Sequence, residues 1–355
     1  MANDLFAFIG TYTRLGSEGV YTLRMNGDTG ELTQVSVATG LENPSFVALD
    51  PSGEHLYAVS ETSGFDGSGG ITAFGVNADS GELTQINQVS TGGPGPCHLM
   101  IDSTDSLAIV TNYGGGSVSA HLINDDGSIS ERTEFIQHEG SSVNPNRQEQ
   151  AHAHSVNIDP SNSRAYVCDL GMDKVLTYDI DLTNGKLSLA SEVDEVAGEG
   201  PRHFTFHPSG NYVYVNNELG NTVTVYDLDG EGGLTPKQTE STLPDDWEGV
   251  SHTADIHVSP DGKFVYCSNR GHDSLAIFSI DRSTGEITRI GIASTMGNEP
   301  RNFAITPDGA FLLAENQNSD TIVTFKREAD GTLTATGSVI NVPAPVCLQF
   351  LPVGG

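Results

Sequence analysis

The stretch HFTFHPSGNYVYVNN, residues 203–217, has the pattern of two short strands joined by a turn. Aromatic and β-branched residues alternate with others on both sides of a central Pro-Ser-Gly. Such a pattern is typical of an antiparallel hairpin. Arg202 and Glu218 stand directly before and after this hairpin. Because the turn lies at one end of the hairpin, these two residues should meet at the other end.

The same hairpin recurs along the chain. Further copies span residues 46–60, 98–112, 155–169, 255–269 and 302–316, and a shortened copy begins at residue 347. The turns of successive copies are 45 to 57 residues apart. A second strand–turn–strand pattern follows, with an acidic turn such as NADSGE or DRSTGE, so each unit has four antiparallel strands. Seven such units predict an all-β, seven-bladed β-propeller that forms a single domain over residues 1–355.

The two ends of the chain fit this prediction. The seventh unit stops after its first strand and turn, and the chain begins with an unmatched strand, LFAFIG, at residues 5–10. We expect this N-terminal strand to complete the last blade and to close the ring, which removes exposed sheet edges. Three segments are longer than the repeat requires, and we expect them to be loops inserted into the propeller. They cover residues 61–69, 136–150 and 238–252.

Charge limits the possible partners. The chain has 47 Asp and Glu against 16 Lys and Arg, a formal net charge of -31, and the acids recur in every turn. A surface of this kind repels nucleic acid and anionic membranes, so we expect neither as a partner. It also favours a halophilic source, since at about 1 M salt the Debye length falls to roughly 3 Å and self-repulsion is screened. No stretch of eighteen apolar residues and no signal peptide is visible, and we therefore expect a cytoplasmic location.

The cysteines and histidines do not form a recognisable metal motif. The four cysteines lack a CxxC pair, and we expect buried thiols. The run AHAH, residues 151–154, offers two histidines without a third ligand at a fixed spacing. We therefore predict no metal and no cofactor.

The propeller geometry gathers residues of every unit at the same channel mouth. In each blade the first strand lines the channel, so its start and the end of the second strand lie at the rim opposite the Pro-x-Gly turn. These positions hold three of the eleven arginines, several histidines and two glutamates. We predict catalytic roles for Glu218, His154, Arg202 and Arg270, and substrate-binding roles for Arg301, His203, His98 and Glu61.

This convergence indicates an anion-binding pocket. Arginine gives paired hydrogen bonds to carboxylate or phosphate, and a histidine or glutamate beside it can act as a general base. The same residues could instead be internal ion pairs that tie the blades together.

The segments GPRHFTFHPSG, NNELGNTV, ADIHVSPDGKFVYCSNRGHDS and EPRNFAITPDG also resemble the seven-bladed lactonase family, nearly from end to end. That family includes the propeller-type 6-phosphogluconolactonase and the fungal carboxy-muconate lactonizing enzyme. The resemblance implies a cytosolic, metal-independent lactone enzyme. It also places the family's His, Arg, Glu and Arg on His154, Arg202, Glu218 and Arg270.

Three hypotheses follow. In the first, the protein hydrolyses a sugar lactone, with a small anionic lactone such as 6-phosphoglucono-1,5-lactone as the substrate. Glu218 or His154 would activate water, and the arginines would stabilise the oxyanion or hold the anionic group. In the second, the same site acts on a muconate-type acid or its lactone. In the third, the propeller is a non-catalytic binding module.

Overall fold

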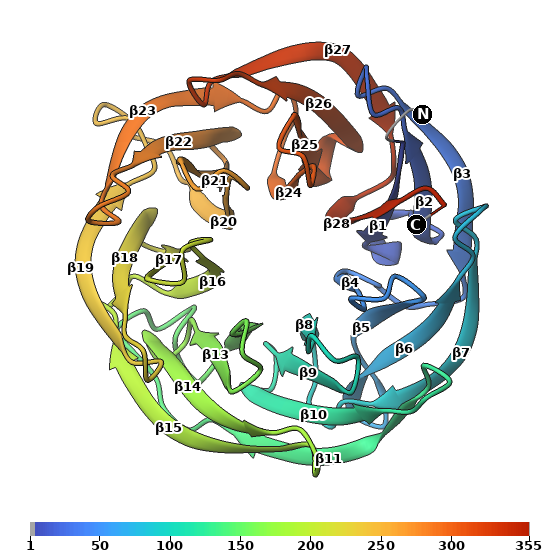
Figure 1. Ribbon diagram of the computed structural model, residues 1–355. Coiled ribbons are helices and arrows are strands. Elements are labelled where there is room, and N and C mark those ends of the chain that lie inside the picture. Colours follow the sequence, from blue (N-terminus) through green and yellow to red (C-terminus); the bar gives the residue numbers. More distant parts are fainter. Residues whose placement is uncertain (1–3, 355) are drawn as a thin grey trace.

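The computed structural model describes residues 4–354 as seven four-stranded antiparallel sheets arranged in a ring around a central axis (Figure 1). This confirms the predicted all-β, seven-bladed propeller. Helix is limited, within these residues, to two short 3₁₀ turns, Thr13–Leu15 and Gln317–Ser319. None of the helices in the described part of the chain has the length and apolar character needed to cross a membrane.

Each blade has its first strand at the central channel and its fourth strand on the outside (Figure 1). The first blade holds β4 (Val47–Leu49), β5 (His55–Phe65), β6 (Ser68–Val76) and β7 (Leu83–Ser90). The second holds β8 (Pro96–Ile101), β9 (Leu107–Asn112), β10 (Ser117–Ile123) and β11 (Ile129–Gln137). The third holds β12 (Ala153–Ile158), β13 (Arg164–Asp169), β14 (Lys174–Asp181) and β15 (Lys186–Asp194). The fourth holds β16 (Pro201–Phe206), β17 (Tyr212–Asn217), β18 (Thr222–Leu228) and β19 (Leu234–Ser241).

The remaining blades follow the same plan. The fifth holds β20 (His252–Val258), β21 (Phe264–Arg270), β22 (Ser274–Ile280) and β23 (Ile287–Ser294). The sixth holds β24 (Pro300–Ile305), β25 (Phe311–Asn316), β26 (Thr321–Arg327) and β27 (Leu333–Asn341). The seventh holds β28 (Pro345–Pro352), β1 (Leu5–Thr11), β2 (Gly19–Met25) and β3 (Leu32–Thr39).

The seventh blade joins the two ends of the chain. Its inner strand β28 pairs antiparallel with β1, from Leu5 opposite Pro352 to Gly10 opposite Cys347. On its other edge, β1 pairs with β2. The predicted closure by the N-terminal strand is therefore confirmed.

The core lies between blades. Second strands such as β17 are buried nearly throughout because side chains on both of their faces contact a neighbouring sheet. Outer strands such as β19 alternate between half-buried and exposed residues. This difference explains why the repeats combine continuous apolar runs with alternating polar ones.

A tyrosine on the second strand ties several blades to the next blade. The hydroxyls of Tyr57, Tyr166, Tyr214 and Tyr266 donate to the carbonyl oxygens of Gly127, Gly232, Gly285 and Gly331, at distances of 2.8 to 3.1 Å. Each acceptor lies in the turn before the outermost strand of the following blade. These glycines have positive φ, which glycine adopts without strain, and the turn can therefore fold back against the tyrosine.

One predicted loop is different in the structure. Residues 61–69 were expected to form an insertion without regular structure, but β5 continues to Phe65 and Phe65 pairs with Ser68 of β6. The segment is an extension of the hairpin. The segment is rich in Gly and Ser, which have low β propensity, so the sequence predicted a loop. Pairing with the neighbouring strand overrides this weak local preference.

Candidate active site

A bulge at the start of the inner strand positions the rim residues. In six of the seven blades, the register between the first two strands skips a residue at this point. The skipped residues are Cys97, His154, Arg202, Arg301 and Val346, and in the fifth blade the pair Ala254 and Asp255. A β-bulge re-aims a side chain that regular pairing would direct elsewhere. The rim positions that the repeats predicted therefore share a β-bulge.

Glu218 is the centre of the cluster. Its Oε2 lies 2.9 Å from Nε of Arg202 and 2.9 Å from a terminal guanidinium nitrogen of Arg270. The side chains of Arg202, Arg270 and Glu218 are 2%, 9% and 4% exposed. The hairpin thus brings Arg202 and Glu218 together as the sequence indicated, and the next blade adds Arg270.

A third arginine, which sequence reasoning missed, reaches Glu218 from the loop between β11 and β12. A terminal nitrogen of Arg147 pairs with Oε1 of Glu218 and lies 3.3 Å from the hydroxyl of Tyr113. Its side chain is 33% exposed. The loop is longer than the loops at the same place in the other repeats, so the spacing of the repeats could not place Arg147. The excess of arginine over glutamate at the predicted rim did not point to a further arginine either.

The charges of the cluster control its protonation. Burial alone would raise the pKa of Glu218, but the guanidinium groups of Arg270, Arg202 and Arg147 outweigh it and hold that pKa below its usual value. Burial, together with the positive charges of Arg270 and Arg301, lowers the pKa of Arg202 to about 10. At neutral pH Glu218 is a carboxylate and Arg202 remains a cation.

His154 lies beside this cluster and is neutral. Its Nε2 is 4.0 Å from Oε2 of Glu218, and its Nδ1 is 3.9 Å from the sulfur of Cys97. Burial and then the charges of Arg202, His203 and the nearby arginines hold the pKa of His154 well below its ordinary value. The structure therefore brings His154 of the AHAH run into the mouth. His152 instead stacks on Tyr113, with ring centroids 4.4 Å apart.

His203 links Arg202 to a buried carboxylate. Its Nδ1 lies 2.7 Å from Oδ1 of Asp255, and its Nε2 lies 3.1 Å from a terminal nitrogen of Arg202. The carboxylate fixes the tautomer with the proton on Nδ1, so Nε2 accepts a hydrogen bond from Arg202. Burial and the charge of Arg202 lower the pKa of His203 to about 4 despite Asp255. Asp255 was not among the predicted site residues.

Arg301 and Glu61 occupy the opposite side of the mouth. Both line a small hollow with Tyr12 and Arg202. The Tyr12 hydroxyl donates to Oε2 of Glu61 at 2.8 Å, and the Arg301 guanidinium lies 5.5 Å from the centre of the Tyr12 ring. The hollow has a volume of ≈ 10 Å³, so side chains nearly fill this part of the mouth.

His98 lines the channel next to His203, away from the Arg–Glu cluster. It stacks on Phe46, with centroids 4.1 Å apart, and its ring centre is 5.4 Å from that of His203. With His203 and Asp255 it lines a separate channel cavity of ≈ 130 Å³, which is distinct from the hollow beside Arg301. The structure therefore places His98 outside the Arg–Glu cluster.

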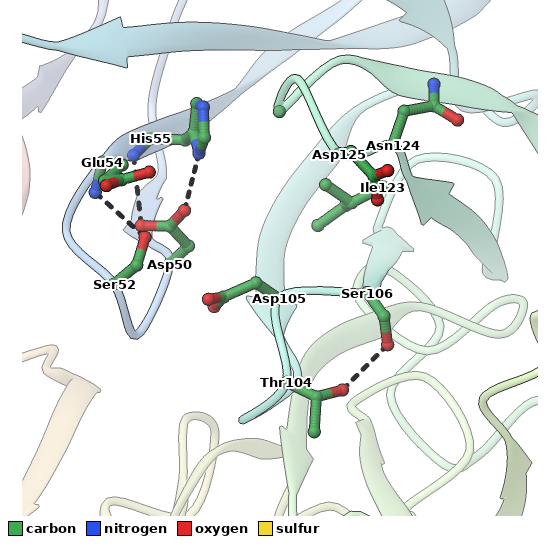
Figure 2. Close-up of a pocket in the computed structure, with 11 residues that line it drawn as sticks. Asp50, Ser52, Glu54, His55, Thr104, Asp105, Ser106, Ile123, Asn124 and Asp125 are labelled. Carbon is green, nitrogen blue, oxygen red and sulfur yellow. Dashed lines mark hydrogen bonds and ion pairs between the residues drawn. The ribbon is translucent and has the colours of Figure 1, made fainter.

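The turn end of the propeller has a different character. A hollow of ≈ 270 Å³ lies there between the first and second blades, lined by Asp50, Glu54, His55, Asp105 and Asp125 among others (Figure 2). His55 pairs with Asp50 at 2.8 Å. An anionic ligand would be repelled by this lining, and the Arg-rich mouth is the better site for one.

The mouth as a whole carries a positive surplus. Four guanidinium groups, from Arg147, Arg202, Arg270 and Arg301, lie at the mouth with the carboxylates of Glu61 and Glu218, and the Asp255 carboxylate lies behind His203, so the cations outnumber the acids. Nε of Arg270 is buried and has no hydrogen-bond partner within residues 4–354. Such an arrangement can bind an anion and stabilise an oxyanion next to a neutral histidine.

Comparisons with known proteins agree with this architecture. The family model described as "Lactonase, 7-bladed beta-propeller" matches residues 6–350. The chain is 36% identical to a 6-phosphogluconolactonase of Bacillus subtilis, over 97% of each chain. It is 37% identical to a 6-phosphogluconolactonase of Formosa agariphila, over 95% of each. The solved structure of the periplasmic gluconolactonase of Pseudomonas aeruginosa superposes with a TM-score of 0.93 at 32% identity, covering 99% of each chain. The chain belongs to the seven-bladed β-propeller lactonase family.

Proposed function

We propose that this protein hydrolyses the ester bond of a sugar lactone, and that its substrate is 6-phosphoglucono-1,5-lactone. The observation that carries the proposal is the cluster of Arg202, Arg270 and Glu218 beside the neutral His154 at one channel mouth. The surplus of arginines at the mouth favours a phosphate monoester, which is close to a dianion at neutral pH. The names of the Bacillus and Formosa relatives support the same substrate.

His154 is the better general base of the two residues that the sequence left open. Both oxygens of Glu218 are engaged by guanidinium groups, so they are poorly placed to take a proton from water. His154 is neutral, and its Nε2 lies 4.0 Å from Glu218. When His154 takes a proton from water, the carboxylate of Glu218 stabilises the imidazolium that forms.

The reaction then follows from ordinary ester chemistry. The activated water adds to the lactone carbonyl, and guanidinium groups of Arg202 and Arg270 stabilise the oxyanion. The ring C–O bond breaks, and the protonated His154 returns its proton to the departing ring oxygen. The product is a hydroxy acid, which ionises and releases one proton to the solvent.

Glucono-1,5-lactone without a phosphate is the second candidate. The P. aeruginosa relative is named a gluconolactonase, and its fold superposes on nearly the whole chain. The same base and oxyanion contacts would serve either lactone. The difference between the two substrates lies in the residues that contact the phosphate.

Proton release on addition of each fresh lactone tests the proposal. The purified protein is assayed in about 1 M KCl, where the Debye length is roughly 3 Å. We expect rapid opening of the phosphorylated lactone by the wild type, and loss of this activity in the His154→Gln and Glu218→Gln variants. A folded wild-type protein that opens neither lactone faster than the spontaneous rate would refute the proposal. It would leave the muconate-type and binding-module hypotheses.

A further inference from the structure

The loop between β11 and β12 holds Arg147 in place while leaving its side chain accessible. Next to it, Gln148 is fully buried, and its side-chain amide donates to the carbonyl of Leu170 at 2.9 Å. The same side chain accepts a hydrogen bond from the backbone N–H of Asn144 at 3.1 Å. The backbone at residue 147 is thus fixed, while the Arg147 side chain is 33% exposed.

Arg147 differs from the other two arginines that contact Glu218. Arg202 and Arg270 extend from strands and are 2% and 9% exposed, so they cannot move without disturbing the core of the ring. Both contact Oε2, whereas Arg147 contacts Oε1. If Arg147 turned away, Glu218 would keep two guanidinium partners, and the carboxylate would remain neutralised.

A substrate also needs space and a counter-charge at the mouth. The hollow beside Arg202 and Arg301 has a volume of ≈ 10 Å³, too small for a sugar, so a substrate needs the outer part of the mouth, where the accessible side chain of Arg147 lies. With 33% of its side chain exposed, Arg147 is the least restrained by packing of the three cations on Glu218, and a partly solvated side chain has several accessible rotamers. Tyr113, 3.3 Å from the guanidinium, provides a second anchor at the mouth.

We propose that Arg147 selects the phosphorylated lactone, by turning from Oε1 of Glu218 to the phosphate of the bound substrate. This inference rests on the proposed lactonase function and adds the residue that distinguishes the two candidate substrates. Arg202 and Arg270 act at the carbonyl that both lactones share. Arg147, at the outer edge of the cluster, contacts the group that only one of them carries.

The test compares Arg147→Gln with the wild type on both lactones. Loss of a charge-assisted contact to phosphate should reduce kcat/KM for 6-phosphoglucono-1,5-lactone by about 10- to 100-fold, mainly through KM. For glucono-1,5-lactone, which lacks the phosphate, the fall in kcat/KM should be much smaller, so the ratio of the two kcat/KM values should change by about tenfold or more. Calorimetric binding of 6-phosphogluconate, but not of gluconate, should weaken to a similar extent. Arg147→Lys keeps the charge but not the paired geometry, so its kcat/KM for the phosphorylated lactone should lie between those of the wild type and Arg147→Gln.

Arg164→Gln is the matched control. Arg164 is also a partly exposed arginine paired with a carboxylate, Asp179, at 2.9 Å, and it lies outside the mouth. The Arg164→Gln variant should have wild-type kcat/KM for both lactones. Equal losses on both lactones in Arg147→Gln, or a loss confined to kcat, would show that Arg147 acts through Glu218 and would overturn the inference while leaving the proposed function intact. A wild type that opens neither lactone would overturn both.

Discussion

His154 is the residue whose protonation should control the rate. Its pKa is held well below the ordinary value of about 6.5 by burial and by the arginines, so it is unprotonated in neutral solution. Activity requires this unprotonated form; it is present above the lowered pKa and is lost as the pH falls through it. We therefore expect kcat/KM to stay level through about pH 6.5 and to fall only in more acidic solution.

A pH profile of kcat/KM for the wild type measures this directly. An acidic limb centred at about pH 6.5 or higher would contradict it, because that is the behaviour of an unperturbed imidazole. The variant His55→Gln changes a histidine at the turn end of the propeller (Figure 2) and should leave the profile unchanged.

Asp255 should act on catalysis through His203. In Asp255→Asn the carboxylate that fixes the tautomer of His203 is lost, so its Nε2 no longer reliably accepts from Arg202. We expect kcat to fall by about tenfold, the equivalent of one net hydrogen bond to a charged group, with a smaller change in KM. His257→Gln is the control. It removes the other histidine on Asp255, 2.9 Å away, and leaves the bond to His203 in place. If both variants lost kcat equally, Asp255 would be a structural residue only.

At the scale of the element, the strand β1 stabilises the ring by joining the two ends of the chain. Phe8 in its middle is fully buried between the seventh and first blades. Phe8→Ala should lower the free energy of unfolding by about 3–5 kcal/mol, because it removes apolar contacts and leaves a cavity. Phe135→Ala, at a side chain that is 38% exposed on β11, should stay within about 0.5 kcal/mol of the wild type. Denaturant unfolding of both variants measures the difference, and comparable losses would show that closure depends little on β1.

The elements also show how far the sequence could predict the site. The hairpin pattern correctly predicted that Arg202 lies next to Glu218, because strand pairing fixes which residues meet at a rim. The bulge that re-aims Arg202 leaves no mark in an alternating pattern, since it changes the register and not the composition. Arg147 lies in an insertion outside the repeat, so its contact with Glu218 depends on a loop conformation that periodicity does not encode.

At the scale of the whole molecule, the net charge of -31 should make stability depend on salt. Acids in the turns, including Asp28, Asp126, Asp281 and Asp330, are exposed on the surface and repel one another. Because salt screens this repulsion, we expect the melting temperature to rise between about 0.1 and 2 M KCl. Thermal unfolding in a KCl series tests the halophilic hypothesis. Chloride is chosen because sulfate stabilises most proteins by exclusion from their surface. A constant or falling melting temperature would count against it.

The pairing of β28 with β1 has a consequence for how the protein is made. A ribosome releases β1 to β3 first and β28 last, so the seventh blade has its outer three strands long before its inner one. Until the chain is complete, β1 presents an unpaired edge and the apolar residues around Phe8 lack one neighbour. A chain that stops early therefore cannot close, whatever the quality of its other six blades. Closure of the ring therefore waits for β28, and a chain that lacks this strand keeps an open sheet edge and exposed apolar residues, which favour aggregation.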